Sequence, residues 1–305
     1  MTTKEFTAAG VGRATATPQR TTTWWRRKST QQRLSLWLSS VIVWAGAFFM
    51  LIPIFWMLSA SLKKEGDVFL IPIRWIPNPV LWSNYPDALV FQPFWLYFRN
   101  SVLVTSLNVV GAVFTASLVG FAFARLRAPG KNALFVILLS TLMLPAEVTL
   151  VPVYLLFRNV GWLDTYLPLI VPSWFGGSAF YIFLLRQFFM TLPTELDDAA
   201  KIDGANLFTI YWRILMPLSK PALASVAIFS FFSNWNNFQA ALIYLNTMEK
   251  YTLPVGLRLY LSSFGKTHWN FLMAATIVSI IPPILIFFTS QRYFVQGAVL
   301  TGVKG

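Results

Sequence analysis

The sequence of 305 residues contains no cysteine and a single histidine. Without cysteine, the chain has no disulfide, no thiolate metal site and no cysteine nucleophile. Charged residues are also scarce, at 11% of the chain, against about 25% in a typical soluble protein. This deficit excludes an ordinary soluble enzyme, a disordered chain and a nucleic-acid binder. With 56% hydrophobic residues and a mean hydropathy of +0.60, the sequence predicts an integral membrane protein.

Six long stretches carry almost no charge. Each has at least 21 residues, and about 20 apolar residues cross the hydrocarbon core of a bilayer as a helix. The short alternating strands typical of a membrane barrel are not seen. The sequence therefore predicts an all-α membrane protein with a six-span domain over residues 34–291. Its six transmembrane helices are expected at about 34–62, 100–124, 132–157, 165–185, 221–248 and 267–291.

The basic residues are distributed unevenly between the loops. Of the 24 Lys and Arg residues, 16 lie in the two terminal tails and the second and fourth loops. Because basic loops stay in the cytoplasm, this bias predicts that both termini are cytoplasmic. We expect residues 1–33 to form a disordered basic tail and residues 292–305 a second cytoplasmic tail. The net charge of +13 is then explained by loop bias and contact with anionic lipid.

The fourth loop, residues 186–220, holds four of the eleven acidic residues within nine positions. They follow Thr194, which predicts a helix over 195–203 that is capped by the Thr194 side chain and has acids in its first turn. Gly204 is expected to end this helix in the left-handed conformation. The four acids are Glu195, Asp197, Asp198 and Asp203.

This predicted helix also has a face of small side chains, because Leu196, Ala199 and Ala200 are spaced at i, i+3 and i+4. Such a face can enter a groove on a partner protein, and the acids beside it can pair with arginines there. A solvated surface helix is the other interpretation of the same pattern.

The run Asp198-Ala199-Ala200-x3-Gly204-x9-Ile214-x-Met216-Pro217 resembles the E-A-A-x3-G-x9-I-x-L-P signature of permease subunits of bacterial ATP-binding-cassette importers. The spacing matches throughout, with Asp198 in place of Glu and Met216 in place of Leu. Further segments are similar to the maltose-type sugar permeases, and in particular to the second of their two permease subunits. These segments are 143–148, 151–156, 235–238, 251–257, 291–297 and 302–305.

The resemblance implies a non-catalytic permease subunit that carries a di- or oligosaccharide or a related solute. It implies that the 195–203 helix couples the permease to an ATPase subunit, and that the C-terminal tail reaches toward the ATPase dimer. It further implies a second homologous permease subunit and an extracytoplasmic sugar-binding protein, in a bacterial cell membrane. The residues assigned to coupling are Glu195, Asp197, Asp198, Ala199, Ala200, Asp203, Gly204, Ile214 and Pro217, and those of the tail are Gly302, Val303, Lys304 and Gly305.

Polar side chains cluster in the fifth predicted span, where an amide facing lipid is costly. Amides beside an aromatic ring suit a sugar, so these residues are candidates for the transport pathway. Hydrogen bonding between helices is the alternative role. The candidates are Asn234, Trp235, Asn236, Asn237 and Gln239.

Glu147 is the one carboxylate within a predicted span, between Pro145 and Pro152. Both prolines are expected to bend or break the helix, which favours a structural role for Glu147 over proton coupling. Gly176-Gly177 and Pro282-Pro283 are predicted packing or hinge positions.

No cofactor is expected in this chain. His268 has no second ligand at metal-binding spacing, and no phosphate-binding loop is complete, so ATP and Mg²⁺ are expected on the partner ATPase subunits. A stand-alone ion- or proton-coupled secondary transporter is the alternative function, although such proteins often show inverted repeats and several buried charges. A membrane-embedded enzyme lacks a nucleophile–base pair among the spans.

Overall fold

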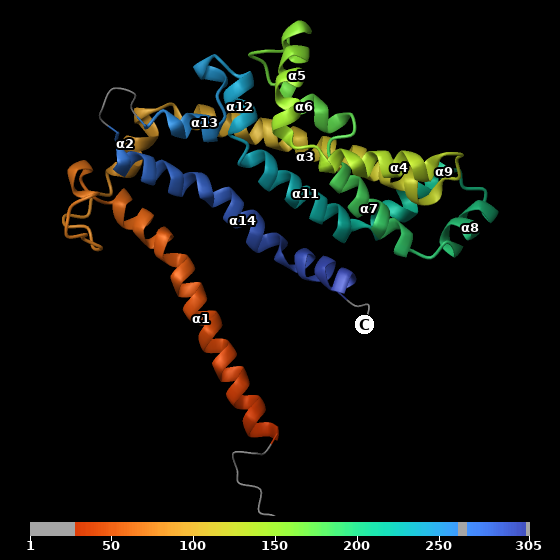
Figure 1. Ribbon diagram of the computed structural model, residues 1–305, viewed down its shortest axis with the longest axis horizontal. Coiled ribbons are helices and arrows are strands. Elements are labelled where there is room, and N and C mark those ends of the chain that lie inside the picture. Colours follow the sequence, from red (N-terminus) through yellow and green to blue (C-terminus); the bar gives the residue numbers. More distant parts are fainter. Residues whose placement is uncertain (1–27, 262–266, 303–305) are drawn as a thin grey trace, which may run out of the picture. The chain divides into compact units, whose positions relative to one another are not determined.

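The computed structural model describes residues 28–261 and 267–302, and in these two ranges all regular structure is helical (Figure 1). The chain divides into two compact units, residues 1–55 and 56–305. The longer helices are α1 (Lys28–Ser61), α3 (Phe94–Arg125), α4 (Lys131–Ser140), α5 (Ala146–Asn159), α7 (Ala179–Thr191), α11 (Lys220–Trp235) and α14 (Trp269–Gly302). The shorter ones are η2 (Glu65–Asp67), α2 (Asn84–Phe91), η3 (Thr141–Met143), α6 (Leu167–Trp174), α8 (Glu195–Ile202), α9 (Leu207–Thr209), η4 (Ile210–Leu215), α10 (Met216–Leu218), α12 (Gln239–Tyr244), η5 (Met248–Lys250) and α13 (Leu253–Arg258).

Among the described residues, four helical segments are long and apolar enough to cross a membrane: Gln32–Ser61, Phe94–Arg125, Leu167–Thr191 and Trp269–Gln291. Two bent pairs, Lys131–Met143 with Ala146–Asn159 and Leu207–Leu218 with Lys220–Trp235, raise the number to as many as six. The all-helical membrane fold predicted from the sequence is confirmed. The predicted boundaries, however, differ from the observed helices in several places.

α3 lies at the centre of the second unit because small residues let other helices approach it closely. A Cβ atom added to Gly120 would lie 3.1 Å from the backbone nitrogen of Arg186 and 3.3 Å from the carbonyl oxygen of Ile182, both in α7. A Cβ atom on Gly111 would lie 2.6 Å from the Trp174 ring of α6. α6, α7 and α11 therefore pack directly on α3 (Figure 1).

The third predicted span is broken rather than straight. α4 with η3 and α5 meet at an angle of 100°, and the break lies at Leu144 and Pro145, both in extended conformation. Proline disfavours the helical conformation for the residue before it, so the predicted break at Pro145 is confirmed. Pro152, by contrast, lies inside α5 without ending it.

The fifth predicted span, 221–248, is wrong as one continuous helix, because α11 ends at Trp235 and α12 begins at Gln239. Asparagine side chains bond to nearby backbone at this break: Asn236 Nδ2 donates to the Phe232 carbonyl at 2.9 Å, and Asn237 Oδ1 accepts from the Ala240 N–H at 3.1 Å. Such local bonds compete with the helix.

The fourth and sixth predicted spans also need correction. Gly176 and Gly177, with φ of 106° and 40°, separate α6 from α7, and α7 continues to Thr191 rather than ending near residue 185. Pro282 and Pro283 lie inside α14, which runs past the predicted end of its span to Gly302.

Candidate functional site

The candidate coupling site is α8 and the chain that follows it. The side chain of Thr194 makes no capping bond, so that prediction is wrong. The Thr194 carbonyl instead accepts the N–H groups of Asp197 at 3.0 Å and Asp198 at 3.2 Å. Gly204, with φ of 80°, takes the left-handed conformation after the helix, as predicted.

Asp197 and Ala200 form the inner face of α8, and each is 7% exposed. Asp197 Oδ2 lies 3.3 Å from Arg125 Nε, at the last residue of α3, and the Arg125 Nη2 donates to the Leu192 carbonyl at 2.8 Å. Ala200 belongs to the core cluster that contains Phe189 of α7 and Tyr211 of η4. α8 is therefore held to α3 by the Asp197–Arg125 ion pair and to the core by the apolar contact of Ala200.

The outer face of α8 is open. Leu196 is 38% exposed and Ile202 is 87% exposed, and Ala199 lies exposed between them. The predicted grouping of Leu196, Ala199 and Ala200 on one face therefore does not hold, because Ala200 turns inward. Ile202 was not predicted to belong to this face. Its spacing of three residues from Ala199 and six from Leu196 does, however, place it on the same side of a helix.

The acids of α8 have different surroundings. Glu195 and Asp203 are exposed at the two ends of the helix, and Asp198 pairs with Lys201 at 2.9 Å, also in solvent. Asp198, which replaces the Glu of the signature, thus has an accessible carboxylate. The Asp197 carboxylate is buried and paired with Arg125.

The chain after α8 continues through α9, η4 and α10. Asn206 Oδ1 accepts the Thr209 N–H at 2.8 Å and caps α9, and η4 continues as a π-helix. Tyr211 of η4 is buried, and its hydroxyl lies 2.7 Å from Ser117 Oγ of α3. Ile214 packs against the same core cluster, while Pro217 is exposed.

The polar candidates of the fifth span lie around the break between α11 and α12. Trp235 is 4% exposed and packs with Phe231 and Phe98, so its ring belongs to the core and not to an open surface. Asn234 Nδ2 donates to the Ser230 carbonyl at 2.8 Å. The three remaining candidates are Asn236 and Gln239, which are exposed, and Asn237, which is half-buried.

Other predicted positions are placed as follows. Glu147 is exposed in the first turn of α5, directly after the break. Gly302 is the last residue of α14, and Val303, Lys304 and Gly305 lie outside the described residues. His268 Nδ1 lies 3.3 Å from Glu65 Oε2. Within the described ranges, no three His, Asp or Glu side chains gather as metal ligands.

A hydrogen-bond network around Asp164 was not predicted from the sequence. Its carboxylate accepts the Thr247 hydroxyl, the Lys250 ammonium at 2.9 Å and the N–H groups of Thr247 and Asn246, each at 2.9 Å. These bonds, the Thr247 hydroxyl first, hold the pKa of Asp164 well below its usual range. They join the loop before α6 to the loop after α12, although the bonded residues are more than 80 positions apart in the sequence.

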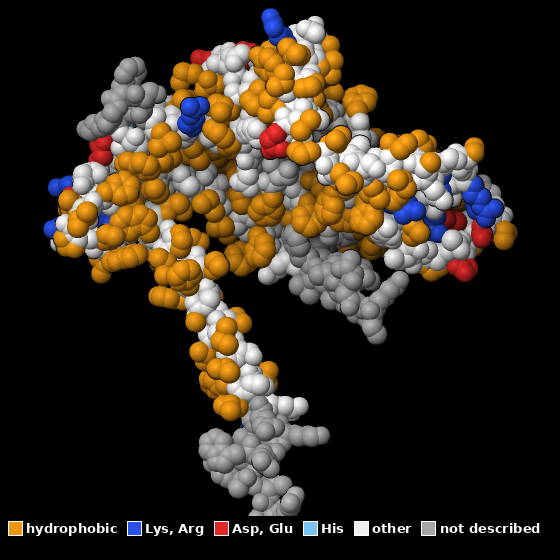
Figure 2. Space-filling model, in the orientation of Figure 1, with side chains coloured by type: hydrophobic (Ala, Val, Ile, Leu, Met, Phe, Trp, Pro, Cys, Tyr) orange, Lys and Arg blue, Asp and Glu red, His pale blue; other side chains and the backbone are white. Residues whose placement is uncertain are grey.

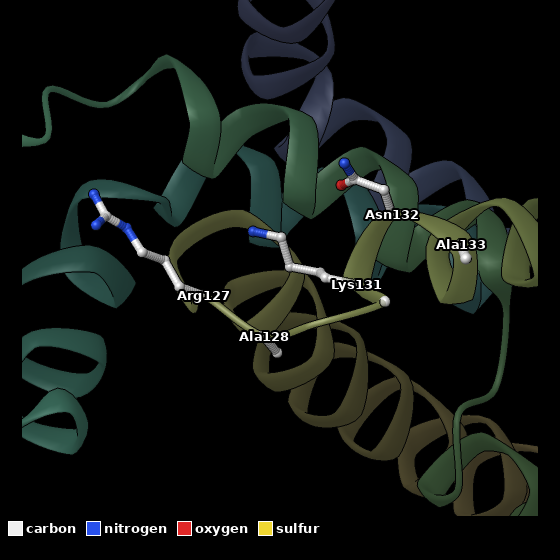
Figure 3. A pocket seen from close by; sticks show the side chains of 6 residues that line it. Arg127, Ala128, Lys131, Asn132 and Ala133 are labelled. Carbon is white, nitrogen blue, oxygen red and sulfur yellow. The ribbon is translucent and has the colours of Figure 1, made fainter.

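A basic hollow lies at the loop between α3 and α4 (Figure 3). Arg127 and Lys131 line it together with Asn132 and small residues, and no acid or nucleophile is among them. Lys131 Nζ donates to the Leu126 carbonyl at 2.7 Å, which fixes the loop.

Comparison with known proteins gives the same family from sequence and from fold. The model of a family described as binding-protein-dependent transport system inner membrane component matches residues 112–299. The sn-glycerol-3-phosphate transport system permease protein of Yersinia enterocolitica is 35% identical over 266 residues, which are 85% of this chain and 94% of that protein. The arabinooligosaccharides transport system permease protein of Halalkalibacterium halodurans is 32% identical over 282 residues, which are 92% of this chain and 100% of that protein.

A solved structure of a bacterial ABC transporter involved in the import of the acidic polysaccharide alginate contains a similar chain. The TM-score is 0.76 at 26% identity, and the match covers 87% of this chain and 98% of that chain. Fold and relatives together define a multi-pass membrane permease subunit of the ATP-binding-cassette importer class. The chain belongs to the family of binding-protein-dependent transport system inner membrane components. The family resemblance and the permease function predicted from the sequence are confirmed, and the alternative of a stand-alone secondary transporter has no support among these relatives.

Proposed function

We propose that this chain passes a carbohydrate or a related solute across the bacterial cell membrane and receives the energy for transport through α8. The observation that carries the proposal is the buried ion pair between Asp197 of α8 and Arg125 of α3. A force applied to α8 by a partner passes directly to a membrane-spanning helix, because the pair and Ala200 fix the helix to the core.

The surface offered to that partner is the outer face of α8. Leu196, Ala199 and Ile202 give it an apolar strip, and Glu195, Asp198 and Asp203 surround the strip with exposed carboxylates. A groove with apolar walls and basic residues at its rim is the complementary surface. We assign this groove to an ATPase subunit, which binds ATP and Mg²⁺ and hydrolyses the ATP while the permease chain performs no catalysis.

The remaining partners follow from the same assignment. α8 and the basic loops lie in the cytoplasm, as do both termini. A second homologous permease subunit completes the pathway, and a solute-binding protein delivers the solute at the opposite membrane face. The similar proteins are named for the transport of sn-glycerol-3-phosphate, arabinooligosaccharides and alginate, which supports a carbohydrate or polyol phosphate as the solute here.

Coupling requires that the two conformations of the permease bind the ATPase dimer with different affinity. A helix that docks on the ATPase and is tied to α3 meets this requirement, because closing the ATPase dimer displaces α8 and α3 together. Coupling free energies of this kind change an affinity by about 5- to 150-fold.

The test substitutes Ala199→Arg in the complete complex, reconstituted in proteoliposomes with its ATPases, second permease and binding protein. We expect solute uptake and solute-stimulated ATPase activity to fall by about tenfold, because the arginine prevents close docking. The matched control is Ala128→Arg, an exposed alanine in the loop before α4, with wild-type activity expected. Wild-type coupling in the Ala199 variant would refute the role of α8, and uptake without any ATPase would favour a secondary transporter instead.

A further inference from the structure

The segment Phe69–Trp82 links η2 to α2 without forming a helix or a strand. Its apolar side chains point away from the protein: Ile71 is 94% exposed, Ile76 is 80% exposed and Trp82 is 68% exposed. Ile73 and Trp75 are also more than half exposed. Figure 2 shows hydrophobic side chains gathered over this segment, at the left end of the view, with Lys or Arg atoms at its edge.

This segment is fixed to the last turn of α1. The Ser59 hydroxyl donates to the Trp75 carbonyl, and the Leu81 N–H donates to the Leu62 carbonyl at 2.9 Å. The rings of Trp56 and Trp75 meet edge to face with centroids 5.6 Å apart. Because α1 is a candidate membrane span that ends at Ser61, these contacts hold the segment at the depth where the span leaves the membrane.

The inner side of the segment covers a buried cation. Lys63 is 2% exposed, and its Nζ lies 4.3 Å above the Trp56 ring. Lys63 lines a small cavity together with Asp67, Arg74 and Ile76. The charged group is thus enclosed beneath the segment. Ile71 and Trp82 do not line this cavity, and Ile76, which borders it, keeps 80% of its surface exposed.

The proline, tryptophan and arginine residues of this segment also suit the boundary between lipid and water. Pro72, Pro77 and Pro79 have no N–H group, so an irregular backbone here exposes fewer unpaired donors to a poorly hydrated environment. Trp side chains favour the headgroup level, and arginine beside them can reach lipid phosphate. Trp75, Trp82 and the exposed Arg74 supply both.

We propose that the Phe69–Trp82 segment lies in the lipid–water interface and inserts Ile71, Ile76 and Trp82 into the leaflet at the end of α1. Lipid is the occupant because the segment is hydrogen-bonded to the end of a candidate membrane span and presents exposed apolar side chains there. The segment acts as an anchor that fixes the height of the loop between α1 and α2. This inference depends neither on the coupling role of α8 nor on which membrane face is cytoplasmic.

The absence of cysteine permits a direct test. Ile71→Cys and Ile76→Cys are labelled with a nitroxide in the complete complex, reconstituted in vesicles of phosphatidylethanolamine and phosphatidylglycerol. Ile71 and Ile76 are 94% and 80% exposed, so we expect neither change to disturb the core. The lipid reference is Trp44→Cys in α1, which is 76% exposed, and the water reference is Asp87→Cys, exposed in α2.

We expect the labels at positions 71 and 76 to show the accessibility of the lipid reference, with collision by oxygen favoured over collision by a water-soluble nickel chelate. Accessibility equal to that of the water reference would overturn the proposal. Labels that are water-accessible at first and become shielded only when the binding protein is added would also overturn it, because a protein would then be the occupant.

Discussion

Arg125 and Asp197 form an ion pair in which neither side chain is more than 10% exposed, and the pair joins the end of α3 to α8. Arg125 also bonds to the Leu192 carbonyl, at the end of α7. Three elements that are separate in the sequence thus meet at one guanidinium group.

Removing one partner of this pair should be costly. Asp197→Ala leaves the guanidinium buried and unpaired, and we expect a loss of about 3–5 kcal/mol, measured as a lower Tm of the complex in nanodiscs. The double variant Arg125→Met/Asp197→Leu should recover most of that loss, because an apolar pair of similar volume carries no desolvation penalty.

The control for this prediction is Asp198→Ala. Asp198 and Lys201 form an exposed pair, and pairs of this kind contribute about 0–1 kcal/mol, so the Tm should barely change. Equal losses in the Asp197 and Asp198 variants would contradict the structural role of the buried pair.

Because α7 approaches α3 closely at Gly120, we expect a larger side chain at this position to lower stability strongly. Gly120→Leu pushes a side chain against the backbone of Arg186 and Ile182, which cannot move aside as a flexible side chain would. We expect a loss of about 1–3 kcal/mol or more from overpacking, read as reduced assembly and a lower Tm.

Gly46→Leu in α1 is the matched control for Gly120. A Cβ atom there meets no atom within 4 Å, and leucine favours a helix more than glycine does. The stability of the isolated chain should therefore be unchanged or slightly higher. A larger loss at Gly46 than at Gly120 would show that α3 and α7 do not pack as described.

The network around Asp164 predicts a pH dependence at low pH. Because folding lowers the pKa of this carboxyl, its contribution is complete above the unfolded pKa, near 3.9, and is lost as the pH falls through the folded pKa. Stability from Asp164 should thus be constant between about pH 7 and 5 and decline only below about pH 4.

Asp164→Asn separates this contribution from general acid unfolding. The amide keeps an acceptor but loses the charge-assisted bonds, and we expect a loss of about 1–3 kcal/mol at pH 7. The difference in Tm between wild type and variant should shrink as the pH drops below 4. A difference that stays constant down to pH 3 would exclude titration of Asp164 as its cause.

The features predicted best from the sequence depend on local chemistry. Charge-free stretches predicted the all-helical membrane fold, Pro145 a break and Gly204 the end of α8. Each of these acts through its own backbone or through the surrounding solvent, so neighbouring residues suffice to recognise it.

The features that were missed depend on distant partners. Nothing beside Asp164 in the sequence indicates Thr247 and Lys250. Likewise, Asp197 and Asp198 are adjacent identical residues, and only the position of Arg125 decides which one is buried. The end of α11 at Trp235 is a local feature that was also missed, because no charge interrupts the stretch there. Asn236 and Asn237 instead bond to nearby backbone at the break.

α3 connects the two ends of the second unit through polar contacts at both of its termini. Near its start, Asn100 Nδ2 donates to the carbonyls of Glu249 and Tyr251 at 2.9 and 3.0 Å, and Ser101 Oγ accepts the Leu253 N–H at 2.7 Å. Its last residue is Arg125, which holds α8. A helix of 32 residues is about 48 Å long, so it can act as a lever: a tilt of about 5° displaces one end by about 4 Å relative to the other.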